Sequence, residues 1–190
     1  MSIWELTKVV IILHDNYLNT FMIRYIFPLL FFTSVYCQSL DGFMDFKWKS
    51  IKPQIKYGMS KQEGAQLTTD DDDLLAFSGG EFANKTVRFW SFWFYDDKFY
   101  HVDVVFDTLL SNSTEIFQSA KTYLEDIYGR TDLFQRIDQN KRAIYWTFNG
   151  ENNEPESLIQ LIRTNKEGKH DDIQISYTYL PLYKKKRGIK

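Results

Sequence analysis

The sequence predicts an α+β domain: an antiparallel sheet of about six strands in hairpins and meanders, with one long helix and one short helix packed on one face. Three observations predict this class. Two segments alternate apolar and polar residues, one segment repeats apolar residues at helical spacing, and 17% of the chain is aromatic. Since a large ring buries roughly 150 to 250 Å², a domain of about 150 residues can form a substantial core without disulfides.

The two alternating segments are predicted to be half-buried strands. In residues 99–107 one face carries Tyr100, Val102, Val104 and Phe106, and the other carries His101, Asp103 and Asp107. Residues 173–179 alternate in the same way, with Ile173, Ile175, Tyr177 and Tyr179 on the apolar face. This pattern is typical of antiparallel sheets that cover a core on one side only.

Further strands are predicted on either side of these. Residues 87–95 are apolar on both faces, and Asp96-Asp97-Lys98 joins them to the strand at 99–107. We therefore expect a hairpin with its first strand near the centre of the sheet. Residues 143–148 and 157–163 continue the series, and residues 165–168 link the latter to the final strand, which makes a meander.

Two helices are predicted. The long one begins after Asn112, which can cap it together with Glu115, and ends at Gly129. The shorter helix is expected to begin at Ser60, because Ser60-Lys61-Gln62-Glu63 has the pattern of a capping box.

Residues 1–37 are interpreted as a leader, and residues 38–190 as a single domain with a basic tail at 184–190. Arg24 precedes an uncharged apolar run from Tyr25 to Phe32, which short residues follow, as in a signal peptide. The run is shorter than the roughly 20 residues that span a bilayer. We therefore expect an exported protein, periplasmic, cell-surface or secreted, with Met22 as the true start; an interrupted membrane anchor over residues 9–37 is the alternative.

Cys37 is the only cysteine of the chain, and three interpretations of it stay open. It is lipidated as in a bacterial lipoprotein, it is removed as the last residue of the leader, or it is retained as a free thiol. In each case the domain has no disulfide framework, no cysteine-based zinc site and no cysteine nucleophile.

A short motif resembles small exported bacterial proteins. Residues 55–63, I-K-Y-G-M-S-K-Q-E, are similar to the Gly-Met-Ser/Thr-x-x-Glu opening of the outer-membrane-assembly lipoprotein (SmpA/OmlA) and β-lactamase-inhibitor-like type. A looser similarity is to other exported bacterial domains, which open with a strand that ends in tryptophan, continue with a serine-capped helix and later carry a helix that ends in Tyr-Gly. Here these places are taken by Trp48, Ser60 and Tyr128-Gly129. The resemblance implies a periplasmic or surface α+β module without known catalysis, and it carries over no functional residue.

Composition and motifs argue against several function classes. The formal net charge is -2, and the charges in the leader cancel, so the part after the leader keeps a charge near zero and no nucleic-acid partner is expected. His14, His101 and His170 form no metal-binding or triad pattern, and no phosphate-binding glycine loop occurs. We expect no catalytic residue, no metal and no cofactor, and membrane contact only through the leader or a lipid anchor. The acidic run at 70–73 is interpreted as a solvated loop, and residues 184–187 as a solvated terminus.

The aromatic run at 90–100 either packs in the core or lines a groove. The candidate ligand-binding residues are Trp90, Trp93, Tyr100, His101 and Asp103. Three functions follow: a non-enzymatic cell-envelope module that binds or assembles with an unknown protein or ligand, a carrier of a small apolar or glycan ligand, and a hydrolase that uses His101 and Asp103 with Asp107.

Overall fold

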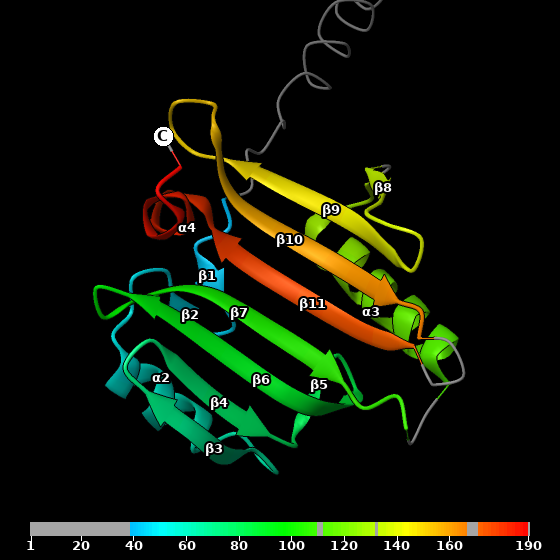
Figure 1. The fold of residues 1–190 in the computed structure, drawn as a ribbon, viewed down its shortest axis with the longest axis horizontal. Helices are drawn as coiled ribbons and strands as arrows, with labels where there is room; N and C mark the ends of the chain where they lie inside the picture. The colour runs from blue at the N-terminus through cyan, green and yellow to red at the C-terminus, as the bar shows by residue number, and fades with distance from the viewer. Residues whose placement is uncertain (1–38, 110–111, 132, 167–170, 190) are drawn as a thin grey trace, which may run out of the picture. The chain divides into compact units, whose positions relative to one another are not determined.

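The computed structural model describes residues 39–109, 112–131, 133–166 and 171–189, and Figure 1 shows their fold. The predicted leader, the start at Met22, Cys37 and His170 lie outside the described residues. Within them the helices are α2 (Lys52–Met59), α3 (Ser113–Tyr128) and α4 (Leu180–Arg187). The strands are β1 (Gly42–Phe43), β2 (Phe46–Lys47), β3 (Gln66–Asp71), β4 (Leu74–Ser78), β5 (Glu81–Phe82), β6 (Lys85–Tyr95), β7 (Lys98–Phe106), β8 (Phe134–Arg136), β9 (Lys141–Asn149), β10 (Pro155–Thr164) and β11 (Asp172–Tyr179).

The α+β class and the antiparallel sheet are confirmed, but the sheet has nine strands where about six were predicted. Eight strands lie in the order β3-β4-β6-β7-β11-β10-β9-β8, and the short β5 pairs with β6. Strands β1 and β2 form a separate hairpin. The additional strands come mainly from residues 66–78, where the acidic run that was interpreted as a loop is instead the end and turn of the β3–β4 hairpin.

The sheet consists of two similar halves that meet at its centre. In each half a helix is followed by an antiparallel meander: α2 precedes β3, β4, β6 and β7, and α3 precedes β8, β9, β10 and β11. Each meander runs from an outer edge inward, so the last strands of the two halves, β7 and β11, pair with each other. Figure 1 shows this central pair in green and red.

The β6–β7 hairpin follows the prediction closely. Tyr95 pairs with Lys98, and the two turn residues Asp96 and Asp97 have φ of 48° and 57°. Positive φ at both central residues is the conformation that matches the twist of a tight antiparallel hairpin, and aspartate tolerates it better than most residues. The turn therefore fixes the register of β7 at the centre of the sheet.

One face of the sheet forms the hydrophobic core, and we call it the core face. The side chains Trp90, Phe92, Val102, Val104 and Ile175 are 0% exposed on this face. Helices α2 and α3 and the hairpin of β1 contribute to the same cluster through Ile55, Met59, Ile116, Ala120, Leu124 and Phe43. The Trp90 indole also donates a hydrogen bond to the Gly79 carbonyl at 2.7 Å, so its buried N–H is satisfied.

Helix α3 has the predicted ends. Asn112 caps it by accepting a hydrogen bond from the Thr114 amide at 2.9 Å, and Gly129 is the C-cap. Glu115 does not complete a capping box, because its carboxylate pairs with Lys85 at 2.6 Å.

The short helix begins earlier than predicted, and the prediction that it starts at Ser60 was wrong. Helix α2 ends there, and Ser60 is its C-cap. Pro53 stands in the first turn, where its missing N–H costs nothing, and the Gln54 side chain accepts a hydrogen bond from the Ile51 amide at 3.2 Å. Residues 60–64 then form turns, and Gly64 has a φ of 75°, so the predicted helix does not form there.

The predicted basic tail also differs, because residues 180–187 form helix α4. Pro181 lies in its first turn, and Lys184 to Arg187 occupy its last turn, where cations interact favourably with the helix dipole. Within the described part of the chain, no helix has the length and apolar character that crossing a bilayer requires.

Candidate functional site

The face of the sheet opposite the core, which we call the open face, carries a polar row at the centre. Asp103 of β7 lies opposite Ser176 of β11, and His101 lies opposite Thr178. Strand β6 adds Trp93 beside His101. The central joint of the two halves thus brings side chains from three strands together.

A β-bulge changes the face that Tyr100 occupies. The register of β6 and β7 shifts between Trp93 and Phe94, so that Phe94 pairs with Phe99 and Trp93 with His101. Tyr100 is the extra residue, and its side chain lines the same cleft as His101 and Asp103. The sequence pattern placed Tyr100 with Val102 and Val104, because strict alternation does not reveal a bulge.

The polar row is a closed hydrogen-bond network. Oδ1 of Asp103 accepts from Ser176 Oγ at 2.5 Å and from Gln174 Nε2 at 2.6 Å, and His101 Nε2 lies 3.1 Å from it. The other ring nitrogen of His101 lies 2.8 Å from the Thr178 hydroxyl. Among the described residues, every hydrogen bond to Asp103 uses Oδ1 and none uses Oδ2. Oδ2 is therefore available to a ligand donor.

This network sets the charge of Asp103. Burial alone would raise the pKa of the carboxyl, but the hydrogen bonds from His101, Ser176 and Gln174, and the charge of the His101 ring whenever it is protonated, lower it below the ordinary value. The carboxylate is therefore ionised at neutral pH.

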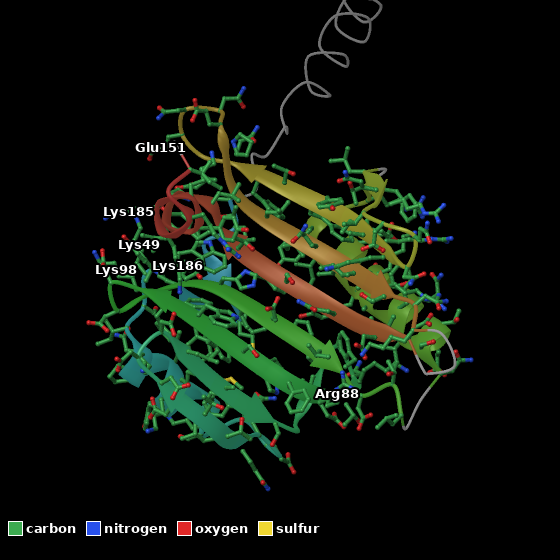
Figure 2. The ribbon with its side chains drawn as sticks, in the orientation of Figure 1. Lys49, Arg88, Lys98, Glu151, Lys185 and Lys186 are labelled. Atoms are coloured by element: carbon green, nitrogen blue, oxygen red, sulfur yellow. The ribbon has the colours of Figure 1, made fainter. Side chains whose placement is uncertain are left out.

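Helix α4 forms the second wall of the cleft. Tyr183 packs near Tyr100 with the ring centroids 6.4 Å apart. The Lys186 ammonium lies 5.9 Å from the Trp93 ring centroid and 5.7 Å from that of Tyr100, and it pairs with Asp73 at 2.7 Å. Figure 2 labels Lys185 and Lys186 on α4, near Lys98 of the β6–β7 hairpin. Lys185 in turn pairs with Asp96 of that hairpin at 3.6 Å.

Together these walls enclose a cleft of about 390 Å³. It is lined by Trp93, Tyr100, His101, Asp103, Tyr183, Lys186 and Arg187. Arg187 lies over the Tyr183 ring at 5.7 Å, and in the described part of the chain it forms no ion pair. The cleft therefore combines the rings of one tryptophan and two tyrosines, one imidazole, one carboxylate, one ammonium and one guanidinium.

Four of the five predicted ligand-binding residues lie in this cleft, and Trp90 does not. Trp90 is fully buried on the core face, where its indole is satisfied by Gly79. The pattern of rings in residues 90–100 did not separate the two faces, because both faces of β6 are apolar.

The three residues from α4 were missed, although the sequence carried a signal for them. Pro181 directly follows a strand, and Tyr183, Lys186 and Arg187 have the spacing i, i+3, i+4 of one helix face.

The side chains do not form a hydrolytic triad. In a triad the histidine stands between the nucleophile and the carboxylate, whereas here Asp103 stands between Ser176 and His101. Asp107 lies four residues beyond Asp103, about 13 Å along an extended strand, and its carboxylate accepts from the Leu109 amide. No cluster of three or more potential metal ligands occurs among the described residues.

Comparison of the chain with protein-family models, with curated proteins and with solved structures finds no match. The resemblance to exported bacterial assembly lipoproteins and β-lactamase-inhibitor-like proteins therefore stays a prediction.

Proposed function

We propose that this protein is a non-enzymatic binding module of the cell envelope, and that the cleft between α4 and the open face binds a small hydroxylated ring that carries an acidic group. The observation that supports this most is the convergence of seven side chains from β6, β7 and α4 on one cleft. Aromatic side chains provide the apolar surface on which a sugar ring packs. Arg187 offers a planar guanidinium for an acid, and Asp103 Oδ2 an acceptor for a hydroxyl.

A binding role fits this site better than catalysis. His101 has both ring nitrogens engaged, and the acceptor capacity of Asp103 is partly taken up by three donors. Within the described residues His101 has no free nitrogen to act as a general base, and the lowered pKa of Asp103 makes its free Oδ2 a weak base at neutral pH. A fixed network of this kind instead holds the floor of the cleft rigid for a ligand.

The ligand class can be tested with two trisaccharides that differ in charge. We expect trigalacturonate to change the tryptophan fluorescence of the protein in a saturable way, and neutral maltotriose to bind more weakly or not at all. Arg187→Gln should weaken trigalacturonate binding about tenfold or more, since a hydrogen bond to a charged group contributes roughly 1.5 to 3 kcal/mol.

Lys184→Gln is the matched control, because it removes the same charge from the same helix at an exposed residue outside the cleft. Equal losses of trigalacturonate affinity in both variants would mean that the effect comes from long-range charge and not from a contact with Arg187. No response to either sugar, measured also by calorimetry, would contradict the proposed ligand class.

Export is the second part of the proposal and needs its own test. Mass spectrometry of the protein from a bacterial host would determine the mature N-terminus. A mature N-terminus at Gln38, or at Cys37 with lipid attached, supports export. A chain recovered from the cytosol with Met1 or Met22 still present contradicts it.

A further inference from the structure

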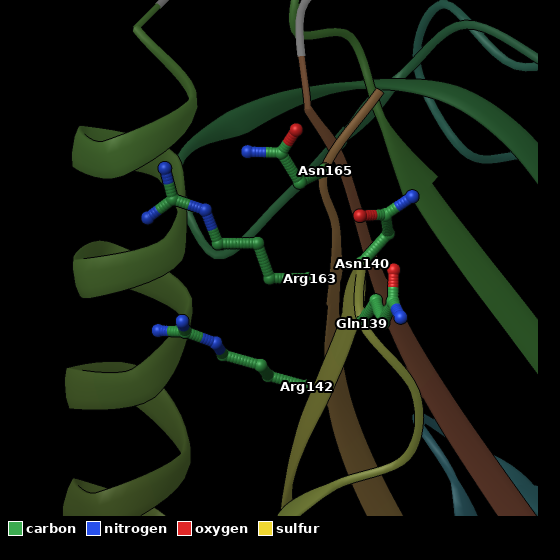
Figure 3. A pocket seen from close by; sticks show the side chains of 5 residues that line it. All are labelled: Gln139, Asn140, Arg142, Arg163 and Asn165. Carbon is green, nitrogen blue, oxygen red and sulfur yellow. The ribbon is translucent and has the colours of Figure 1, made fainter. Parts of the chain in front are cut away.

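A second cleft lies at the other end of the sheet, away from α4. It has a volume of about 370 Å³ and is lined by Gln139, Asn140, Arg142, Arg163 and Asn165. All five side chains are polar, two are cationic and none is acidic. Figure 3 shows Arg142 and Arg163 extending from neighbouring strands in the same direction, toward α3.

The two arginines are direct cross-strand partners in the register of β9 and β10. Side chains at such positions have Cβ atoms only about 4.5 to 5.5 Å apart, and like charges there destabilise an antiparallel pair. One of the two charges is balanced, because Arg163 Nε lies 2.6 Å from the Asp171 carboxylate. Arg142 is exposed and forms no ion pair within the described residues. Among the described residues, the register therefore leaves one positive charge of the cleft without a counter-charge.

Arg163 is held in place with donors to spare. Its Nε is engaged by Asp171, its Nη2 donates to Thr114 Oγ1 at 3.3 Å, and its guanidinium lies 6.0 Å from the Phe117 ring centroid. A guanidinium has five N–H donors, so about three remain. The backbone N–H of Asn165 also donates to the backbone carbonyl of Asn140 at 2.7 Å, and this bond connects the two strand ends at the cleft.

We infer that this cleft binds a tetrahedral oxyanion, the phosphate or sulfate group of a ligand, between Arg142 and Arg163. Guanidinium groups match such oxygens with paired N–H donors, and the anion removes the repulsion between the two side chains. Of the three amides that line the cleft, that of Asn165 extends to the same side as Arg163 and can donate to a remaining oxygen (Figure 3). This site is separate from the cleft under α4 and does not depend on the function proposed there.

Thermal unfolding of the full chain tests the inference, with inorganic phosphate, inorganic sulfate and glucose 6-phosphate as probes at constant ionic strength. Constant ionic strength keeps charge screening the same in every sample. We expect the Tm of the parent protein to rise with probe concentration, as for a ligand that binds the folded state. A larger rise with glucose 6-phosphate points to a phosphorylated ligand, and an equal rise to the free anion.

Arg142→Gln is the decisive variant, because Arg142 is exposed and has no ion pair in the part of the chain that the structure describes, so its loss should not prevent folding. We expect a higher Tm than the parent without probe, since the repulsion is gone, and an affinity for the probes at least about tenfold lower. Arg130→Gln, an equal charge change at an exposed residue outside the cleft, should respond like the parent. The inference is overturned if Arg142→Gln keeps the parent's response, if Arg130→Gln loses it equally, or if no probe stabilises the parent.

Discussion

The carboxylate of Asp103 lies at the middle of the central strand pair and is the group on which the cleft floor depends. Three donors from β7 and β11 converge on its Oδ1. Since both strands end their respective halves of the sheet, these bonds also connect the two halves through side chains. Removing the charge should therefore affect stability as well as the cleft.

We expect Asp103→Asn to lower the free energy of unfolding at pH 7 by about 1 to 3 kcal/mol, the usual range for a group with charged hydrogen bonds. The folded pKa of Asp103 is lowered, so its contribution is complete above the unfolded value, about 3.9, and is lost as the pH falls through the folded pKa. Urea unfolding of both proteins from pH 7 to pH 2.5 should show a difference that shrinks only below about pH 4.

Asp126→Asn makes the same chemical change at an exposed residue of α3 and serves as the control. It should shift stability by less than about 0.5 kcal/mol, as is usual for surface substitutions. A pH-independent difference for Asp103→Asn would mean that shape rather than charge matters there.

A second residue-scale prediction concerns Gly79, which has φ of 79° and approaches another glycine closely. A Cβ built there would lie 2.5 Å from the Gly64 carbonyl oxygen. We expect Gly79→Ala to lower the free energy of unfolding by more than about 2 kcal/mol. The alanine would add a clash with the backbone to the roughly 1 to 2 kcal/mol of strain that a left-handed conformation imposes. Chemical denaturation measures this cost.

Gly188→Ala separates the two contributions. Gly188 has φ of 65°, and a Cβ there would meet nothing within 4 Å. Only the backbone strain should remain, about 1 kcal/mol. Equal costs at both positions would show that the contact between the two glycines is relaxed easily.

At the scale of elements, the long helix is the part that the sequence predicted best. Its polar cap, its apolar spacing and its terminal glycine all act locally, so neighbouring residues suffice to define it. The β6–β7 hairpin was predictable for the same reason, since Asp96 and Asp97 specify the turn.

Other elements depend on partners that the pattern does not contain. Strand β3 carries acidic residues and was interpreted as part of a loop, but Asp70 is neutralised by Lys52 and Lys56 of α2. Helix α2 begins after Ile51, which is not a polar cap, so the capping signal at Ser60 pointed to the wrong end. In the cleft, the residues on β6 and β7 were predicted, whereas those on α4 require the helix to be recognised first.

The cap of α3 gives a prediction at this scale. Asn112→Ala removes the side-chain acceptor for the Thr114 amide, and we expect a loss of about 0.5 to 2 kcal/mol. Asn112→Ser keeps an acceptor and should stay close to the parent. Denaturant midpoints of the three proteins decide this, and equal losses for Ala and Ser would assign the effect to something other than the cap.

At the scale of the whole molecule, both meanders depend on the same final strand. Without β11, β7 and β10 would each present an unpaired edge. A chain that lacks residues 172–190 should therefore fail to fold cooperatively, whereas one that lacks only 188–190 should still fold cooperatively. Near-ultraviolet circular dichroism and amide dispersion in NMR spectra would distinguish these outcomes. A shortened chain with one half intact would show that the halves are independent.

The position of β11 has a consequence for how the molecule is made. Ribosomes release β3 to β7 well before residues 172–179, and long-range strand pairing is slow. During that interval the nascent polypeptide stays incompletely folded and exposes unpaired strand edges, to which chaperones that hold unfolded chains can bind. For the export proposed above, a channel that takes unfolded polypeptides could therefore still accept the chain until synthesis is nearly finished, because the central strand pair forms last.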